Sequence, residues 1–295
     1  MTREDAERLL ESSREPGFLE RAPEGKEVER AVRWFAANGE AESVAELAGN
    51  TWRIWLVSGE VATGRRVLAV ALDAGEGKPS RARAFALYGD GVLAFRADAM
   101  ADSQTRNEEA LETARAAGDR EAEALALVGL SRVALRAGDY TRVRALAAQA
   151  RELTRALEPG AAAAPLHLLA AGTRLAGDYD EAAALYDESL ELARRLGDSR
   201  SVGMELHNLG HVELHRGNAE VAQRHFAERR DVCNPDDPYD TAMTYLNEAA
   251  VALASGERDR AAELLTQSES TLEGAGIVLD PDDAFEVEWL RSRLA

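Results

Sequence analysis

The sequence has very little of the residues on which several structural classes depend. Its one cysteine, Cys233, excludes an internal disulfide and a zinc site built from several cysteines. No window approaches the roughly 18 consecutive apolar residues of a membrane-spanning helix. The N-terminal segment is charged from its third residue and has no apolar core of the kind found in signal peptides. We therefore expect a cytoplasmic protein that does not contact a membrane.

Positive charge is also scarce. The chain has 53 acidic residues against 35 lysines and arginines, which gives a formal net charge of −18. Most of such a surface repels a phosphate backbone, so we expect no direct binding of nucleic acid. Lys26 and Lys78 are the only lysines, a bias that we interpret as the codon usage of a GC-rich bacterial genome.

Aromatic residues make up 5% of the 295 residues, and alanine and leucine carry most of the 45% that are hydrophobic. Both residues favour helices, and a turn interrupts the alanine-rich runs at a regular spacing. Successive turn residues lie 39, 40, 39, 40 and 39 positions apart, at Gly59, Asp98, Gly138, Gly177, Gly217 and Gly256. This spacing predicts an all-α fold without β-sheet, an α-solenoid (right-handed superhelix) of antiparallel helix pairs with a repeat of 39–40 residues.

Two segments carry the repeat most clearly, LLAAGTRLAGDYDEAAALY at 168–186 and LHNLGHVELHRGNAEVAQRHF at 206–226. They resemble the tetratricopeptide repeat. Its small residues correspond to Ala170 and Gly210 in the first helix and to Ala182 and Ala222 in the second. The period is longer than the usual 34 residues, which implies extended helices.

Two segments indicate a more specific resemblance: EVERAVRWFAANGEAESVAELAGN and ESLELARRLGDSRSVGMELHNLG. They are similar to the C-terminal repeat domain of STAND-class bacterial signalling ATPases and LuxR-type transcriptional regulators. The resemblance spans roughly residues 26–275, but the chain has no phosphate loop and no helix-turn-helix. It implies a sensor module that lacks the motor of these regulators.

The ends of the chain differ from the repeats. We expect an N-terminal helix and loop over 1–25, the repeat array over 26–279 and a capping helix over 280–295, which covers the last apolar face. The acid pairs Asp236–Asp237 and Asp282–Asp283 stand at expected helix starts, and we interpret both as helix caps.

Motifs of known enzymes are missing. The chain has no G-x-S-x-G, H-E-x-x-H or G-x-G-x-x-G, so we predict no enzyme activity, no catalytic residues and no cofactor. The glycines of GDGV at 89–92 lie in an expected helix, where they indicate close helix packing. Four tryptophans, Trp34, Trp52, Trp55 and Trp289, have helical spacing and favour core positions over a binding platform.

His207, His211 and His215 recur every four residues and therefore line one face of a helix. Such histidines can bind zinc or nickel, but neither Cys233 nor an acid has an obvious place beside them. We predict no metal site and interpret the histidines as a polar stripe; a metal site is the alternative.

In tetratricopeptide proteins the first helix of each pair lines a concave groove. In this chain the groove-facing positions are rich in basic and amide residues, and Glu46 is the only acid among them. Arginine suits carboxylates and phosphates, and the resemblance implies that asparagine here pairs with a peptide backbone. The predicted ligand-binding residues are Arg53, Arg96, Arg132, Arg136, Arg174, His167, His207, His211, His215, Asn50, Asn208 and Asn247.

These residues favour a non-enzymatic binding or scaffold module that recognises a protein, a peptide (acidic ones included) or another anionic ligand in its concave groove. The resemblance implies a sensor or adaptor in bacterial signalling or transcription regulation. The alternative is a structural self-assembly module with no groove ligand, and a homodimer is compatible with either function.

Overall fold

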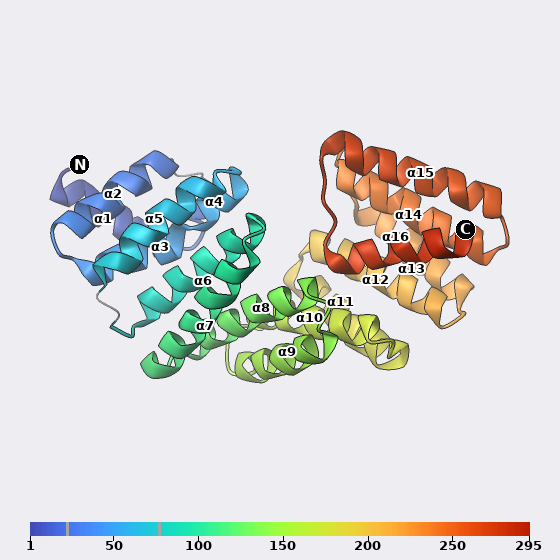
Figure 1. Ribbon diagram of the computed structural model, residues 1–295, viewed down its shortest axis with the longest axis horizontal. Coiled ribbons are helices and arrows are strands. Elements are labelled where there is room, and N and C mark those ends of the chain that lie inside the picture. The colour runs from blue at the N-terminus through green and yellow to red at the C-terminus, as the bar shows by residue number, and fades with distance from the viewer. Residues whose placement is uncertain (22–23, 76–77) are drawn as a thin grey trace. The chain divides into compact units, whose positions relative to one another are not determined.

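The computed structural model describes residues 1–21, 24–75 and 78–295, and every regular element in these ranges is a helix (Figure 1). Contacts divide the chain into two compact units. Unit 1 comprises Met1–Val133 and Gln149–Leu157, and unit 2 comprises Ala134–Ala148 and Glu158–Ala295. The predicted fold class, an all-α solenoid of antiparallel helix pairs, is confirmed.

Unit 1 contains the helices α1 (Arg3–Ser13), α2 (Gly25–Ala37), α3 (Ala41–Thr51), α4 (Arg53–Val57), α5 (Val61–Ala74), α6 (Arg81–Arg96) and α7 (Met100–Ala117). A short 3₁₀ helix, Leu19–Arg21, follows α1. Helices α8 (Arg120–Arg136) and α9 (Tyr140–Thr154) contribute residues to both units. Helix α6 packs against α3, α5 and α7.

Unit 2 contains a short 3₁₀ helix, Pro159–Ala162, and the helices α10 (Ala163–Leu175), α11 (Tyr179–Leu196), α12 (Ser199–His215), α13 (Ala219–Val232), α14 (Pro238–Ala254), α15 (Arg258–Ala275) and α16 (Pro281–Leu294). Three pairs form in sequence order: α10 with α11, α12 with α13, and α14 with α15. Helix α16 lies against α10, α14 and α15 (Figure 1).

The six predicted turn residues all have a positive φ, between 57° at Asp98 and 87° at Gly177. Glycine adopts this left-handed conformation without a steric penalty, and aspartate is one of the few other residues that tolerate it. At two of these six turns the next residue caps the following helix: Asp139 accepts a hydrogen bond from the backbone N–H of Arg142 at 3.0 Å, and Asp178 accepts one from that of Glu181 at 3.4 Å. The repeat positions in the sequence therefore mark the helix ends.

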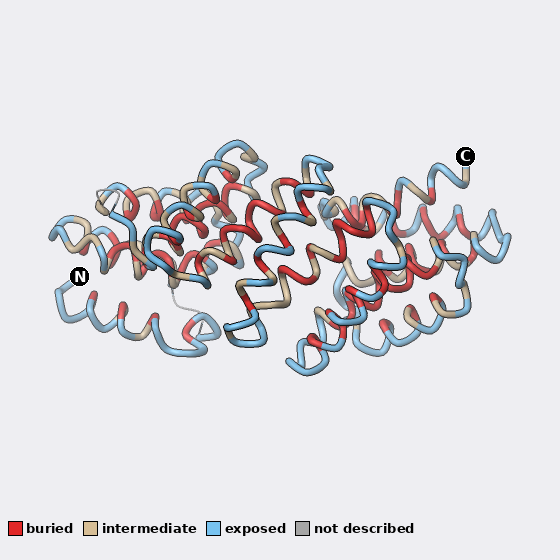
Figure 2. Tube along the Cα trace, turned by 90° about the horizontal axis from the view of Figure 1, so that it is seen from below, coloured by how far each residue is buried: buried red, intermediate tan, exposed pale blue. Residues whose placement is uncertain are grey.

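Small residues bring the paired helices close together, and each helix buries one face (Figure 2). Ala182 and Ala222 have no exposed surface. A Cβ atom on Gly210 would lie 2.1 Å from the Phe226 ring, so α12 and α13 fit together only because position 210 has no side chain.

The predicted close packing at GDGV is confirmed, because a Cβ atom on Gly89 would lie 2.6 Å from the Trp52 side chain. Trp52 and Trp55 are 3% and 0% exposed, so these two tryptophans are core residues as predicted. Trp34 and Trp289 are half-buried and pack against the edges of the core.

Candidate binding site on the inner face of unit 2

The inner face of unit 2 is the surface formed by the first helices of its pairs, α10, α12 and α14. Five basic side chains gather on it, and we call them the basic cluster: His167 and Arg174 from α10, and His207, His211 and His215 from α12. The spacing of four residues between the α12 histidines places their side chains on one side of that helix. The sequence predicted all five as ligand-binding residues.

Three carboxylates of α16, Asp282, Asp283 and Glu286, lie against the basic cluster. Arg174 is completely buried, and its Nη1 donates a 2.7 Å hydrogen bond to Oε1 of Glu286. Its Nη2 donates to the backbone carbonyl of Asp282 at 3.1 Å and lies 3.9 Å from the carboxylate of that residue. The guanidinium thus holds two successive turns of α16.

The histidines contact the same carboxylates. Nε2 of His215 lies 3.0 Å from Oε2 of Glu286, and Nδ1 of His211 lies 3.3 Å from the same oxygen. Nε2 of His207 lies 3.5 Å from Oδ1 of Asp283. Asp283 also accepts a 2.7 Å hydrogen bond from the Tyr239 hydroxyl of α14.

Burial and neighbouring charges separate the protonation states of the histidines. Burial disfavours the charged form of His167, but the carboxylates of Glu205 and Asp282 outweigh it and raise its pKa to about 9. Burial dominates at His207 and lowers its pKa to about 4, despite the nearby carboxylate of Asp283. At pH 7, His167 is therefore protonated and His207 is neutral.

The carboxylates of α16 also differ from one another. Burial, followed by the charge of Asp283, raises the pKa of Asp282 to about 6. Burial also acts against ionisation of Glu286, but the charge and close contact of His211, the hydrogen bond with His215 and the charge of Arg174 hold its pKa well below the usual value. Of the two carboxylates beside Arg174, Glu286 is therefore the one that more strongly favours its ionised form.

The structure corrects the interpretation of Asp282–Asp283 as a helix cap. Both side chains are buried against the basic cluster, and the N-cap residue of α16 is Asp280, whose side chain makes no capping hydrogen bond. At the other acid pair the capping interpretation is confirmed, since Asp237 accepts a 2.9 Å hydrogen bond from the backbone N–H of Tyr239.

The predicted asparagines lie in three different environments. Asn50 donates to the Ser13 hydroxyl at 3.1 Å, where the end of α1 covers it. Oδ1 of Asn247 lies 3.0 Å from Nε2 of His211. The side-chain amide of Asn208 is buried and has no hydrogen-bond partner among the residues described.

The other predicted arginines do not join the basic cluster. Arg53 is exposed and lies over the Trp52 ring at 4.5 Å, and Arg96 is exposed at the end of α6. Arg132 is half-buried in unit 1. Arg136 belongs to unit 2 and lies 3.8 Å from the carboxylate of Asp280, which directly precedes α16.

Several residues around the basic cluster were missed from the sequence. Glu205 of α12 accepts from the Ser189 hydroxyl at 2.7 Å and holds Nδ1 of His167 at 3.1 Å. The three α16 carboxylates were not predicted as partners, because helix capping accounts locally for Asp282 and Asp283 and no repeat relates Glu286 to the histidines. A signal was present, since Asp282 and Glu286 share a helical face with the apolar Leu290.

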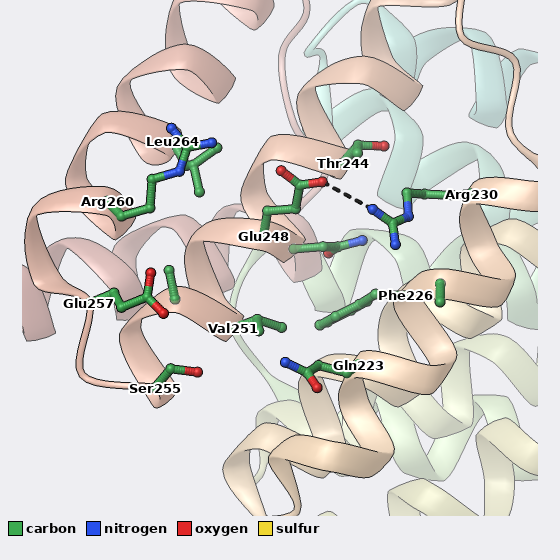
Figure 3. A pocket seen from close by; sticks show the side chains of 13 residues that line it. Gln223, Phe226, Arg230, Thr244, Glu248, Val251, Ser255, Glu257, Arg260 and Leu264 are labelled. Carbon is green, nitrogen blue, oxygen red and sulfur yellow. Dashed lines mark hydrogen bonds and ion pairs between the residues drawn. The ribbon is translucent and has the colours of Figure 1, made fainter.

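A cavity of about 520 Å³ lies on another part of unit 2, between α13, α14 and α15 (Figure 3). Phe226 and Val251 line it together with the ion pair between Arg230 and Glu248, whose atoms are 3.3 Å apart. Two arginines line this cavity, and each is paired with an acid: Arg230 with Glu248, and Arg260 with Glu263 at 3.5 Å.

Two features are absent from the part of the chain that the structure describes. No group of three or more histidine, cysteine, aspartate or glutamate side chains is arranged to hold a metal ion there. None of the helices described is both long and apolar enough to cross a membrane.

Comparisons with known proteins agree with this geometry. The family model for the tetratricopeptide repeat matches residues 161–234, which include α10 to α13. No curated protein matches the sequence.

Solved structures are similar over nearly the whole chain. A tetratricopeptide repeat protein from Parabacteroides merdae is 14% identical, with a TM-score of 0.59 and 99% of each chain covered. A STAND protein with a tetratricopeptide repeat sensor from Pyrococcus horikoshii is also 14% identical, with a TM-score of 0.66 over 99% of this chain and 42% of that one. NprR in complex with its cognate peptide NprX is 14% identical, with a TM-score of 0.64 over 97% of this chain and 81% of that one. Residues 161–234 thus match the tetratricopeptide repeat, and the chain as a whole has the fold of tetratricopeptide-repeat solenoids.

Proposed function

We propose that this chain is a non-enzymatic binding module, a sensor or adaptor in bacterial signalling or transcription regulation, whose inner face recognises a protein or peptide through acidic side chains. One observation carries the proposal: the basic cluster gathers five side chains on one surface of a chain with a net charge of −18, and all five meet carboxylates. The peptide bound to NprR and the sensor role of the repeats in the STAND protein support it.

The chemistry of the basic cluster suits carboxylates on a peptide. Arginine binds a carboxylate with two parallel hydrogen bonds, and each charge-assisted hydrogen bond is about twice as strong as a neutral one. Asn208 of α12 and Asn247 of α14 extend this proposed surface within unit 2. Acidic side chains elsewhere on the chain repel an anionic partner that does not reach the inner face.

Binding is tested in a chain whose α16 carries no carboxylate on the inner face, with Asp282→Asn, Asp283→Asn and Glu286→Gln. We call this variant the neutral-α16 chain. Fluorescence anisotropy should show that it binds a labelled acidic helical peptide more tightly than a lysine-containing peptide of equal length. Because exposed charges are screened, affinity for the acidic peptide should fall as salt rises.

The matched variants separate the inner face from the rest of the chain. His207→Gln together with His211→Gln, added to the neutral-α16 chain, should weaken acidic-peptide binding about tenfold, the equivalent of one charge-assisted hydrogen bond of about 1.5 kcal/mol. His225→Gln, on α13, should leave binding unchanged. Equal binding of acidic and basic peptides, or equal effects of the two substitutions, would contradict the proposed function.

A further inference from the structure

Helix α16 buries an unusual face for a helix that packs against a repeat array. A terminal helix of a repeat array covers an apolar surface with apolar side chains. The residues that α16 buries are Asp282, Asp283, Glu286, Val287 and Leu290, so three of the five are carboxylates. Burying a carboxylate is costly unless a charged or hydrogen-bonding group meets it, and here the basic cluster does. The acidic part of α16 thus resembles a ligand more than a cap.

The spacing of these carboxylates matches the layout of the basic cluster. Asp282 and Glu286 are four residues apart and share one face of α16, where both lie beside Arg174. Asp283 lies on the adjacent face of α16, where it contacts His207 from α12 and Tyr239 from α14. The inner face therefore recognises carboxylates at positions i, i+1 and i+4 of a helix, using residues from three successive first helices.

Helix α16 does not satisfy every polar group beneath it. Nε of Arg174, Nδ1 of His207 and both polar atoms of the Asn208 side chain are buried without a hydrogen-bond partner among the residues described. Each unsatisfied buried group carries a desolvation penalty that a better-fitting ligand can remove. The site is therefore compatible with an occupant that makes more contacts than α16.

We propose that α16 is an internal ligand of the inner face, and that the partner is a protein whose acidic amphipathic helix presents carboxylates at i, i+1 and i+4 and displaces α16. This inference rests on the proposed function and names the partner class for the same site. The apolar Val287 and Leu290 follow the carboxylates on α16, so the partner helix carries apolar residues one turn further on.

The connection to α15 makes α16 an effective competitor. Five residues, 276–280, join the two helices, and a short linker of this kind gives an effective concentration on the order of millimolar. The affinity of a partner is reduced by the fraction of chains in which the face is free. A partner must therefore bind the face well or be held close to it.

The test compares the parent chain with the neutral-α16 chain, using a labelled peptide of residues 279–295 as the probe. If α16 occupies the face in 90% of parent molecules or more, the peptide binds the neutral-α16 chain at least about tenfold more tightly than the parent. A control peptide with amides at the positions of Asp282, Asp283 and Glu286 should bind neither chain.

The outcomes separate this inference from the proposed function. Equal binding of the acidic peptide to both chains would overturn the inference and leave the proposed function standing. No binding to the neutral-α16 chain would overturn both. Light scattering could instead detect a dimer that forms only when the α16 carboxylates are present. That outcome would overturn the inference of a separate partner and indicate that two copies exchange α16.

A second variant covers the case in which the neutral-α16 chain fails to fold, as judged by circular dichroism. Asp283→Asn alone removes the negative charge that faces His207 and Tyr239 and keeps both contacts of Arg174. Its affinity for the peptide should exceed that of the parent, whereas an affinity equal to the parent's would overturn the inference.

Discussion

The contact between Glu286 and Arg174 gives the most quantitative prediction. Both side chains are completely buried, 112 residues apart in the sequence, and Glu286 has further contacts with His211 and His215. Removing one partner of a buried ion pair leaves the other charge uncompensated and costs about 3–5 kcal/mol. Glu286→Gln should therefore destabilise the docking of α16 by an amount in this range.

The assay is urea denaturation together with hydrogen exchange of the α16 amides. The matched control is Glu288→Gln, an exposed residue of the same helix that pairs with Arg291 three residues away and should change stability by less than about 0.5 kcal/mol. If the free energy of α16 docking is smaller than the free energy lost with this contact, the α16 amides lose protection from exchange while the core of α12 keeps it. Equal stability and equal protection in both variants would refute the reasoning.

A double variant separates the uncompensated charge from lost packing. Arg174→Met combined with Glu286→Leu replaces both charges with apolar side chains. Because neither charge is then left alone, the pair should be less destabilising than the sum of the two single substitutions. Additive losses would mean that the two side chains do not interact.

Three further predictions concern two positions of the repeat and the protonation of His167. Ala182→Leu should overpack the α11 interface and lower the unfolding free energy by about 1–3 kcal/mol in denaturant titrations, whereas Ala227→Leu at an exposed position should not. Gly177→Ala, at a φ of +87°, should cost about 1–2 kcal/mol, and Gly274→Ala, inside α15 with open space around it, should instead stabilise by up to about 1 kcal/mol. His167 should titrate near pH 9 by NMR, and a normal pKa would contradict the account. Its contribution to the free energy of unfolding is complete below pH 6.5 and is lost as the pH rises through 9. His167→Gln should therefore remove this pH-dependent loss of stability.

Much of the fold follows from local sequence signals. The turn residues from Gly59 to Gly256 recur at a fixed spacing, and each requires or tolerates a left-handed backbone that ends a helix. Small residues such as Gly210 and Ala222 show which faces meet, because only they allow the observed approach of the helices. These signals act over one repeat, so a single sequence is enough to identify them.

The occupant of the inner face could not be predicted in the same way. Periodicity places His207, His211 and His215 on the first helix of a repeat, but it does not say which segment covers them. Glu286 is 71 residues from His215, and no repeat connects the two positions. A carboxylate on the apolar side of α16 was the only available signal, and helix capping offered a simpler local explanation for the neighbouring acids.

The central claim is that the inner face of unit 2 binds acidic helices and that α16 occupies it as one of them. Hydrogen exchange of the parent chain, with and without excess unlabelled peptide of residues 279–295, tests it most directly. The account predicts that the peptide accelerates exchange in α16 while α10 and α12 stay protected, and that the amide-substituted control peptide has no effect. Unchanged exchange in α16 at peptide concentrations well above the millimolar range set by the linker would contradict it.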